Sequence, residues 1–164
     1  MANTSGIKEM IVCRNGFYFG DPCYALDEKL YNEWLAWGDE REKKEGRWCN
    51  DGKFVHDGMD IMVVDSTAYG DGCYGGIHTN YGVDAGCLAV IPLEFCDESK
   101  NFRDGMGWVC GESGTVTVKT DDTGRFRVYV KGKLIEDVET GDIEEEEEEY
   151  DEETGEFWDE EDEE

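Results

Sequence analysis

The stretch TVTVKTDDTGRFRVYVKGKLIEDV, residues 115–138, consists of three β-prone runs separated by short turns rich in Gly and Asp. In the second run, Phe126, Val128 and Val130 alternate with Arg and Tyr side chains, and a period of two is typical of a strand with one buried face. Turns this short join neighbouring antiparallel strands. The stretch therefore predicts a β-meander, to which residues 106–110 add a fourth strand.

At the N-terminal end, the apolar runs 7–13 and 17–19 flank the dipeptide Asn15-Gly16. Asn-Gly is typical of the two-residue turns that connect hairpin strands, because both positions tolerate the left-handed backbone conformation. We therefore expect a β-hairpin to open the fold.

Two more strand regions lie between this hairpin and the meander. Residues 54–64 keep a strand pattern on both sides of the turn-like pair Asp57-Gly58, and residues 88–91 form an apolar run that ends at Pro92. The second run is expected to be a buried strand.

A single helix is predicted between residues 27 and 38. Asp27 can cap its first turn, its Leu and Trp residues fall on one face, and Gly38 is expected to stop it. The apolar face indicates core packing rather than a binding groove. The charged run 39–47 either extends the helix or forms a solvated loop.

These elements predict eight or nine strands and one helix in residues 1–141. The expected fold class is mainly β (α+β), an antiparallel two-layer sandwich or open barrel with the helix packed on it. Residues 142–164 are expected to be a separate, disordered tail, because closely spaced like charges oppose collapse.

The charge of the chain is strongly negative and unevenly distributed. The formal net charge is −27, from 42 acidic and 15 basic residues. Residues 142–164 contain 17 of the acidic residues and none of the basic ones, which leaves 25 acidic and 15 basic residues, or −10, for residues 1–141. Such a chain attracts basic protein surfaces and repels nucleic acid and anionic lipid. We therefore expect a basic protein partner, with no direct contact with nucleic acid or membrane.

The seven cysteines are odd in number and widely spaced, which argues against a disulfide framework. The N-terminus has no apolar run of the kind found in signal peptides, and no stretch approaches the ~20 apolar residues of a membrane helix. We expect a soluble protein of the cytoplasm with reduced, mostly buried thiols.

The glycine-rich segment 65–86 is the densest unusual stretch of the body. Its carboxylates Asp65, Asp71 and Asp84 could meet on a divalent cation or act as an acid/base pair, although their spacing is not that of a calcium loop. Alternatively, Asp71 and Asp84 serve tight turns and bond backbone amides. The segment is the best candidate for a metal-binding or enzymatic site in the body.

Other chemical sites find less support. Cysteine pairs with the two- to four-residue spacing of zinc sites are missing, and no other cofactor is predicted. A cysteine nucleophile would have only His78 near Cys73, or His56 near Cys49, as a sequence-near base. The basic residues at 125, 127, 131 and 133 are interpreted as the solvent-facing side of a hairpin rather than a nucleic-acid groove.

Three motifs, GDPCYAL (20–26), VDSTAYGDGCYGG (64–76) and YGVDAGCLAVIP (81–92), precede the closing β-meander. Together they resemble an uncharacterised family of small β proteins found in bacteriophages and some bacteria, over about residues 10–140. The resemblance implies a phage-type β domain that acts in the cytoplasm of a host bacterium, and it carries over no catalytic residue.

The tail combines acidic and aromatic residues. Glu144, Glu145, Glu146, Glu147, Glu148 and Glu149 are consecutive, and Tyr150, Phe157 and Trp158 lie among further acids. An extended chain advances ~3.3–3.6 Å per residue, close to the ~3.4 Å between phosphates of one DNA strand. The tail can therefore present charge and aromatic rings to a cationic groove, or it can simply keep the protein in solution.

Taken together, these features favour a phage-encoded inhibitor. It would bind a basic surface of a host protein, such as a defence factor, nuclease, protease or other nucleic-acid-associated enzyme, with its acidic surface occupying a site meant for nucleic acid or another polyanion. The alternatives are a metal-binding or enzymatic domain centred on residues 65–86 and a structural component of the virion. Oligomeric state and the identity of the target are left open.

Overall fold

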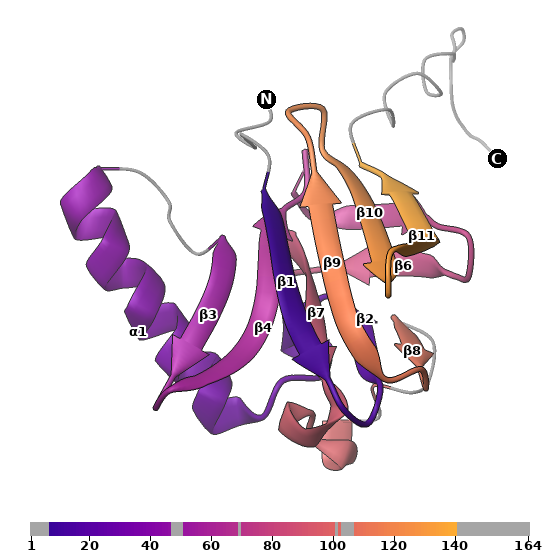
Figure 1. The fold of residues 1–164 in the computed structure, drawn as a ribbon. Coiled ribbons are helices and arrows are strands. Elements are labelled where there is room, and N and C mark those ends of the chain that lie inside the picture. The colour runs from indigo at the N-terminus through magenta and orange to yellow at the C-terminus, as the bar shows by residue number, and fades with distance from the viewer. Residues whose placement is uncertain (1–6, 47–50, 69, 101, 103–106, 141–164) are drawn as a thin grey trace, which may run out of the picture.

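The computed structural model describes residues 7–46, 51–68, 70–100, 102 and 107–140 (Figure 1). Within them the chain forms eleven strands, one α-helix and three short 3-10 helices. The strands are β1 (Lys8–Cys13), β2 (Phe17–Gly20), β3 (Gly52–His56), β4 (Met59–Ser66), β5 (Gly72–Gly75), β6 (Asn80–Val83), β7 (Cys87–Pro92), β8 (Trp108–Cys110), β9 (Gly114–Thr120), β10 (Arg125–Val130) and β11 (Lys133–Glu139). The helices are η1 (Pro22–Tyr24), α1 (Glu28–Glu45), η2 (Leu93–Phe95) and η3 (Glu98–Lys100).

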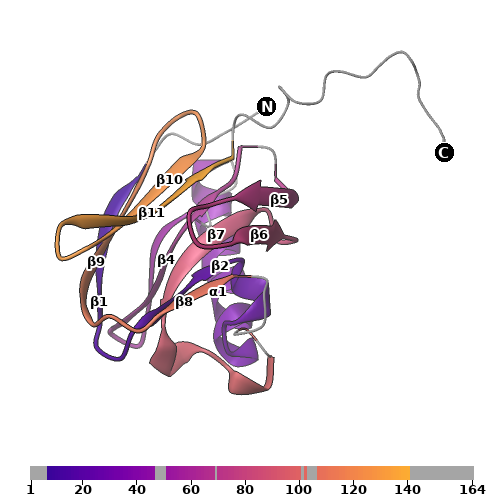
Figure 2. The ribbon, with the colours of Figure 1, turned by 90° about the vertical axis from the view of Figure 1, so that its right-hand side faces the viewer.

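Two antiparallel sheets pack face to face and make up most of the fold. One has four strands in the order β1-β9-β10-β11, and the other has five in the order β3-β4-β7-β2-β8. Strands β5 and β6 form a separate two-stranded hairpin. In side view the four-stranded sheet, the five-stranded sheet and α1 form successive layers (Figure 2). The predicted β sandwich with one packed helix is confirmed.

Strand β7 shows why the middle sheet is so apolar. Leu88 and Val90 point into the core between the two sheets, whereas Cys87, Ala89 and Ile91 point into a second core beneath α1. Every residue of β7 is buried. A strand covered on both faces needs a continuous apolar run rather than alternation, and the predicted buried strand at 88–91 is confirmed.

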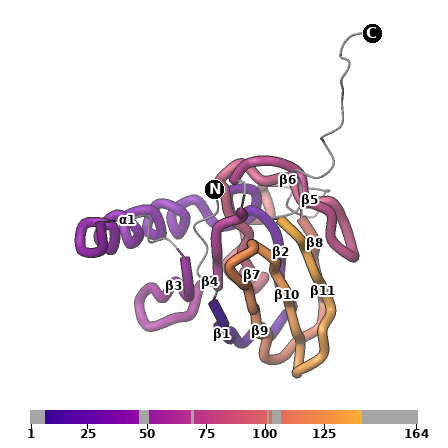
Figure 3. Tube along the Cα trace, turned by 90° about the horizontal axis from the view of Figure 1, so that it is seen from above, coloured from indigo at the N-terminus to yellow at the C-terminus, as the bar shows by residue number. Residues whose placement is uncertain are grey.

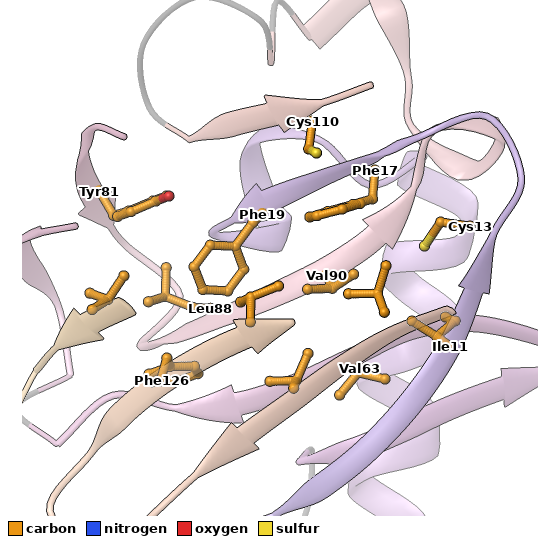
Figure 4. Close-up of a cluster of buried hydrophobic side chains, with 14 of the residues drawn as sticks. Ile11, Cys13, Phe17, Phe19, Val63, Tyr81, Leu88, Val90, Cys110 and Phe126 are labelled. Carbon is orange, nitrogen blue, oxygen red and sulfur yellow. The ribbon is translucent and has the colours of Figure 1, made fainter. Parts of the chain in front are cut away.

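The core between the sheets is rich in aromatic side chains (Figure 4). Phe19 from β2 meets Tyr81 from β6 edge to face, with ring centroids 5.2 Å apart, and lies 6.2 Å from the ring of Phe126 in β10. Edge-to-face pairs add attraction beyond the burial of apolar area. Phe19 thus ties the two sheets and the β5–β6 hairpin to one another.

Helix α1 covers the opposite face of the five-stranded sheet, away from β10 and β11 (Figure 3). The side chain of Asp27 accepts hydrogen bonds from the amides of Lys29 and Leu30, which confirms the predicted cap. The predicted stop at Gly38 is wrong: Gly38 is buried, and the helix continues to a left-handed cap at Gly46. The charged run therefore extends the helix as far as the described residues reach.

The predicted N-terminal hairpin is wrong as well. Strand β1 pairs with β9 and strand β2 pairs with β7 and β8, so the two runs belong to different sheets. The turn at Asn15-Gly16 is a corner between the sheets. There is no room for a side chain at Gly16, because an added Cβ would lie 2.5 Å from the carbonyl oxygen of Cys110.

The closing meander has three strands rather than four. Strands β9, β10 and β11 pair in sequence, with buried Phe126, Val128 and Val130 as predicted. Strand β8, expected as the first strand of the meander, instead pairs with β2 at the edge of the other sheet. The chain between β8 and β9 thus crosses from one layer to the other.

The predicted turn at Asp57-Gly58 is confirmed and joins β3 to β4, with both residues at positive φ. A turn of this kind matches the right-handed twist of the flanking strands. Over the described residues, no helix is long and apolar enough to cross a membrane.

The corner at Gly16 can be tested against a second glycine of similar backbone geometry. Gly16 has φ +91° and Gly132 has φ +84°, but a Cβ at Gly132 would meet nothing within 4 Å. We expect G132A to cost about 1 kcal/mol, the strain of the left-handed backbone alone. G16A also forces a clash with backbone atoms and should cost at least ~2 kcal/mol more. If urea unfolding shows that the two variants lose the same free energy of unfolding, the close packing at Gly16 is contradicted.

Candidate interaction surface

Asp21 holds the glycine-rich segment to the rest of the body. Its carboxylate is fully buried and accepts hydrogen bonds from the amides of Asp84 (2.5 Å) and Ala85 (2.7 Å) through Oδ2, and from Cys23 (2.8 Å) through Oδ1. Three N–H donors satisfy a buried charge that would otherwise be costly to bury. Asp21 thus joins the motif GDPCYAL to the motif YGVDAGC.

Glu136 plays the same part at the other end of the segment. It is fully buried and accepts from the amides of Ile77 (2.6 Å) and His78 (3.1 Å) and from the hydroxyl of Tyr81 (2.6 Å). A shift in register between Leu134 and Glu136 of β11 comes just before this residue, and Glu136 points inward in phase with Val138. This carboxylate fixes the turn of the β5–β6 hairpin.

Neither carboxylate was predicted from the sequence, although both left a signal. Asp21 lies in an otherwise apolar and turn-forming motif, and Glu136 takes the inward phase of a strand in which Val138 is buried. An acid at an inward position must find partners. The glycine-rich segment supplies them through its backbone.

The candidate carboxylates of that segment do not form a common cluster. Asp65 is buried, accepts from the hydroxyl of Thr120 (2.7 Å) and has 2 % of its surface exposed, whereas Asp71 and Asp84 are exposed. The hydroxyl of Tyr24 donates to Asp84. In the part of the chain that the structure describes, no group of three or more His, Cys, Asp or Glu side chains is arranged to hold a metal ion.

In the first cysteine–histidine pair, the histidine ring is held by other partners. Cys73 is exposed, but the ring of His78 stacks on Trp108 with centroids 3.9 Å apart, and its Nε2 donates to the carbonyl oxygen of Ile135 (2.9 Å). The Nε2 nitrogen of His78, which donates to this carbonyl, is therefore not available as a base for the thiol.

For the second pair, Cys49 lies outside the described residues, and His56 stacks on Phe54. The six described cysteines are free thiols, three of them buried. Burial raises the pKa of Cys13 and of Cys23 to about 12, opposite to the shift that activates a cysteine nucleophile.

The outward side of the four-stranded sheet is the most distinctive surface of the described body. We call it the outer face. Its strand residues point away from the core, and four of them are basic while two are acidic. The outer face comprises Lys8, Met10 and Val12 of β1, Thr115, Thr117 and Lys119 of β9, Arg125, Arg127 and Tyr129 of β10, and Leu134, Asp137 and Glu139 of β11.

Three cations of the outer face lie side by side in one cross-strand row. Lys8 is directly opposite Lys119, and Lys119 is directly opposite Arg127, which pairs on its other side with Asp137. Directly opposed residues have Cβ atoms ~5 Å apart, and like charges at that separation repel. Among the described residues neither lysine has an ion-pair partner. The row therefore favours an anionic ligand.

The next row across the same strands is apolar. Met10 and Thr117 are opposite each other, followed by Tyr129 and Leu134. Met10 is 54 % exposed and Leu134 is 41 % exposed, and the ammonium group of Lys119 lies 5.0 Å from the centre of the Tyr129 ring. The outer face thus presents positive charge beside apolar and aromatic surface, a combination that suits an acidic segment with aromatic residues.

Asp137 balances only part of this charge. It forms two bonds of 2.8 Å with the guanidinium group of Arg125 and lies 3.8 Å from Arg127. The hydrogen bonds from Arg125 hold the pKa of Asp137 below its ordinary value. Asp137 therefore stays ionised near neutral pH, and Lys8 and Lys119 carry the uncompensated charge.

The acidic residues proposed as partner-binding, Glu144 to Glu149 with Tyr150, Phe157 and Trp158, lie outside the described residues. The body fixes the point from which they depart. Thr140 is fully buried, donates its hydroxyl hydrogen to Gly124 and accepts a bond from the amide of Ala68 (2.9 Å). Residue 141 therefore follows an anchored position beside the end of β11.

Comparison of the chain with models of protein families, with curated proteins and with solved structures finds no match.

The buried carboxyl of Asp65 predicts a pH dependence of stability. Burial raises its pKa from 3.8 to about 6, against the opposing effect of bonds from Thr120 and Ser66. Between these values the folded chain binds more protons than the unfolded chain, so Asp65 makes the protein more stable as pH falls from 7 to 4, by at most about 3 kcal/mol.

The variant D65N lacks this titration, whereas all other acidic groups titrate in both proteins. Urea unfolding at pH 4, 5, 6 and 7 should show the wild type gaining stability relative to D65N as the pH falls. A difference between the two proteins that stays constant over this range would contradict the raised pKa of Asp65.

Proposed function

We propose that this protein is an acidic interaction protein that binds and inhibits a host protein through a basic surface of that partner. The observation that carries the proposal is the division of charge along the chain. Residues 142–164 hold 17 acidic residues and no basic one, and they follow directly on a folded body that is anchored up to Thr140. A dense anionic segment on a fixed platform suits the capture of a cationic site.

The tail and the body would act at different stages. Charges on the tail attract a basic partner over distances of about a Debye length, ~8 Å at physiological ionic strength, and so raise the rate of encounter. Short-range contacts from the body and from Tyr150, Phe157 and Trp158 would slow dissociation. Six consecutive glutamates, which an extended chain would space like the phosphates of DNA, support mimicry of nucleic acid.

The host is proposed to be bacterial, on the basis of the three sequence motifs and their resemblance to phage and bacterial β proteins. Suitable targets are enzymes with a cationic groove, such as nucleases and other nucleic-acid-associated defence factors. For the metal-binding alternative, the described residues of segment 65–86 include no group of three or more side chains arranged to hold a metal ion, and the proposal does not rest on this segment.

The test starts from the full chain and two matched variants. In the first, Glu144 to Glu149 are all replaced by Gln, which removes six charges and keeps the length of the tail. In the control, Glu28→Gln, Glu33→Gln, Asp39→Asn, Glu40→Gln, Glu42→Gln and Glu45→Gln remove six exposed charges from helix α1. Proteins captured from a bacterial lysate are identified, and their association rates are measured with each variant.

We expect the wild type and the helix variant to capture the same basic, nucleic-acid-binding protein, and duplex DNA to compete for it. At low salt the tail variant should associate at least ~10-fold more slowly, because electrostatic steering is lost. Capture that is unchanged by the tail substitutions and insensitive to salt would refute the proposal.

A further inference from the structure

The cation row of the outer face is an arrangement that the folded body alone does not stabilise. Lys8, Lys119 and Arg127 lie on adjacent strands in one register, and their mutual repulsion is relieved only at one end, by Asp137. An anionic segment laid across β10, β9 and β1 would relieve it along the whole row. This need comes from the sheet register and is independent of any property of the tail.

The chain itself carries a segment of matching chemistry. Residues 142–164 contain acidic residues with Ile143, Tyr150, Phe157 and Trp158 among them, and the outer face offers a cationic row beside an apolar row. We propose that the outer face is the docking site for residues 142–164 of the same chain. The proposal concerns the free protein and does not rest on the proposed inhibition of a host partner.

The point of attachment places the tail at the correct edge. The last residue of β11, Glu139, pairs with Arg125, two positions from Arg127 in the cation row. The four strands span ~14 Å from β11 to β1, whereas the 24 residues beyond Thr140 can extend ~80 Å. Six extended residues cover ~20 Å, so Glu144 to Glu149 are long enough to follow the row from Arg127 to Lys8.

The rest of the described surface offers no comparable concentration of positive charge. Seven of the 15 basic residues lie in the four-stranded sheet and the turns that follow its strands, together with six acidic ones, and on the outer face four basic residues stand beside two acidic ones. On α1, the other basic segment, six acidic residues outnumber four basic ones. The tail is therefore repelled by the helix and attracted to the outer face. The seven residues are Lys8, Arg14, Lys119, Arg125, Arg127, Lys131 and Lys133.

A covalent tether makes weak contacts sufficient. A short flexible connection gives the tail an effective concentration in the millimolar range at the sheet, so the free segment needs only millimolar affinity to be docked about half of the time. Exposed ion pairs of ordinary strength, with an aromatic residue on Met10 or Tyr129, meet this requirement. The contact should weaken with salt, because all of its charges lie at the surface.

If the proposed function also holds, docking makes the tail and a host partner compete. A basic partner would have to compete with the outer face for the tail. Partners with a weakly charged surface would therefore bind less well. The outer face would thus make the tail more selective for strongly basic partners.

The test uses amide chemical shifts of the uniformly 15N-labelled full chain at about 0.01 M salt, where the Debye length is ~30 Å. The wild type is compared with a chain in which Glu144 to Glu149 are all Gln. We expect the shift differences in the body to concentrate on β1, β9 and β10 and to fall at least about fivefold near 1 M NaCl, where the Debye length is ~3 Å.

Two charge reversals in the full chain locate the site. K8E with K119E should abolish the differences between the wild-type and Gln tails, whereas the matched control, K43E with K44E on α1, should keep them. Salt titration of the wild type gives the same information without any change in the body, should the reversal weaken folding.

Differences that are absent, or that spread evenly over α1 and the sheets, would overturn the proposal. Differences that grow with protein concentration, together with a dimer in sedimentation, would also overturn it, because the tail would then dock on a second copy. Failure of host capture with these shifts intact would refute only the proposed function.

Discussion

Two buried carboxylates, Asp21 and Glu136, determine how the rest of the body can be built. A buried charge is tolerated only when its acceptor sites are filled, and here the donors are mainly backbone amides of residues 77–78 and 84–85. The glycine-rich segment must therefore fold back so that both its turns face the body. The middle sheet, covered by α1 on one face and by the other sheet on the opposite face, closes around these contacts.

This constraint changes the meaning of the glycine-rich segment. Gly76 illustrates it, because an added Cβ would lie 2.7 Å from the ring of Tyr81 and 2.9 Å from a carboxylate oxygen of Glu136. Small residues are needed where the backbone approaches a buried acid. The described backbone of the segment thus joins the β5–β6 hairpin and residues 84–85 to the body.

Much of the fold could be predicted from local patterns. The alternation of Phe126, Val128 and Val130, the cap at Asp27 and the turn at Asp57-Gly58 each depend on neighbours in sequence, and all three were confirmed. The wrong expectations concern choices between alternative partners. No feature of residues 7–19 indicates that β1 pairs with β9, more than 100 residues away, rather than with β2.

The same limit applies to the candidate site. Lys8 and Lys119 lie in one row only because β1 pairs with the distant strand β9. No pattern in the sequence around either lysine therefore predicts that they are neighbours. Helix continuation through Gly38 has a similar cause: burial against the sheet outweighs the ~1 kcal/mol cost of glycine in a helix. The carboxylates Asp65, Asp71 and Asp84 are close in sequence but differ in burial, because strand and loop geometry separates them.

Hydrogen exchange of individual amides tests the structural role of the buried carboxylates most directly. In the native chain, the amides of Asp84, Ala85 and Ile77 should exchange as slowly as those of β7, because they donate to buried acids. In D21N, which has one carbonyl acceptor instead of a carboxylate, Asp84 and Ala85 should lose protection while Ile77 keeps it. If all three amides of the wild type exchange at the rate of an open loop, the two buried carboxylates do not hold the glycine-rich segment to the body.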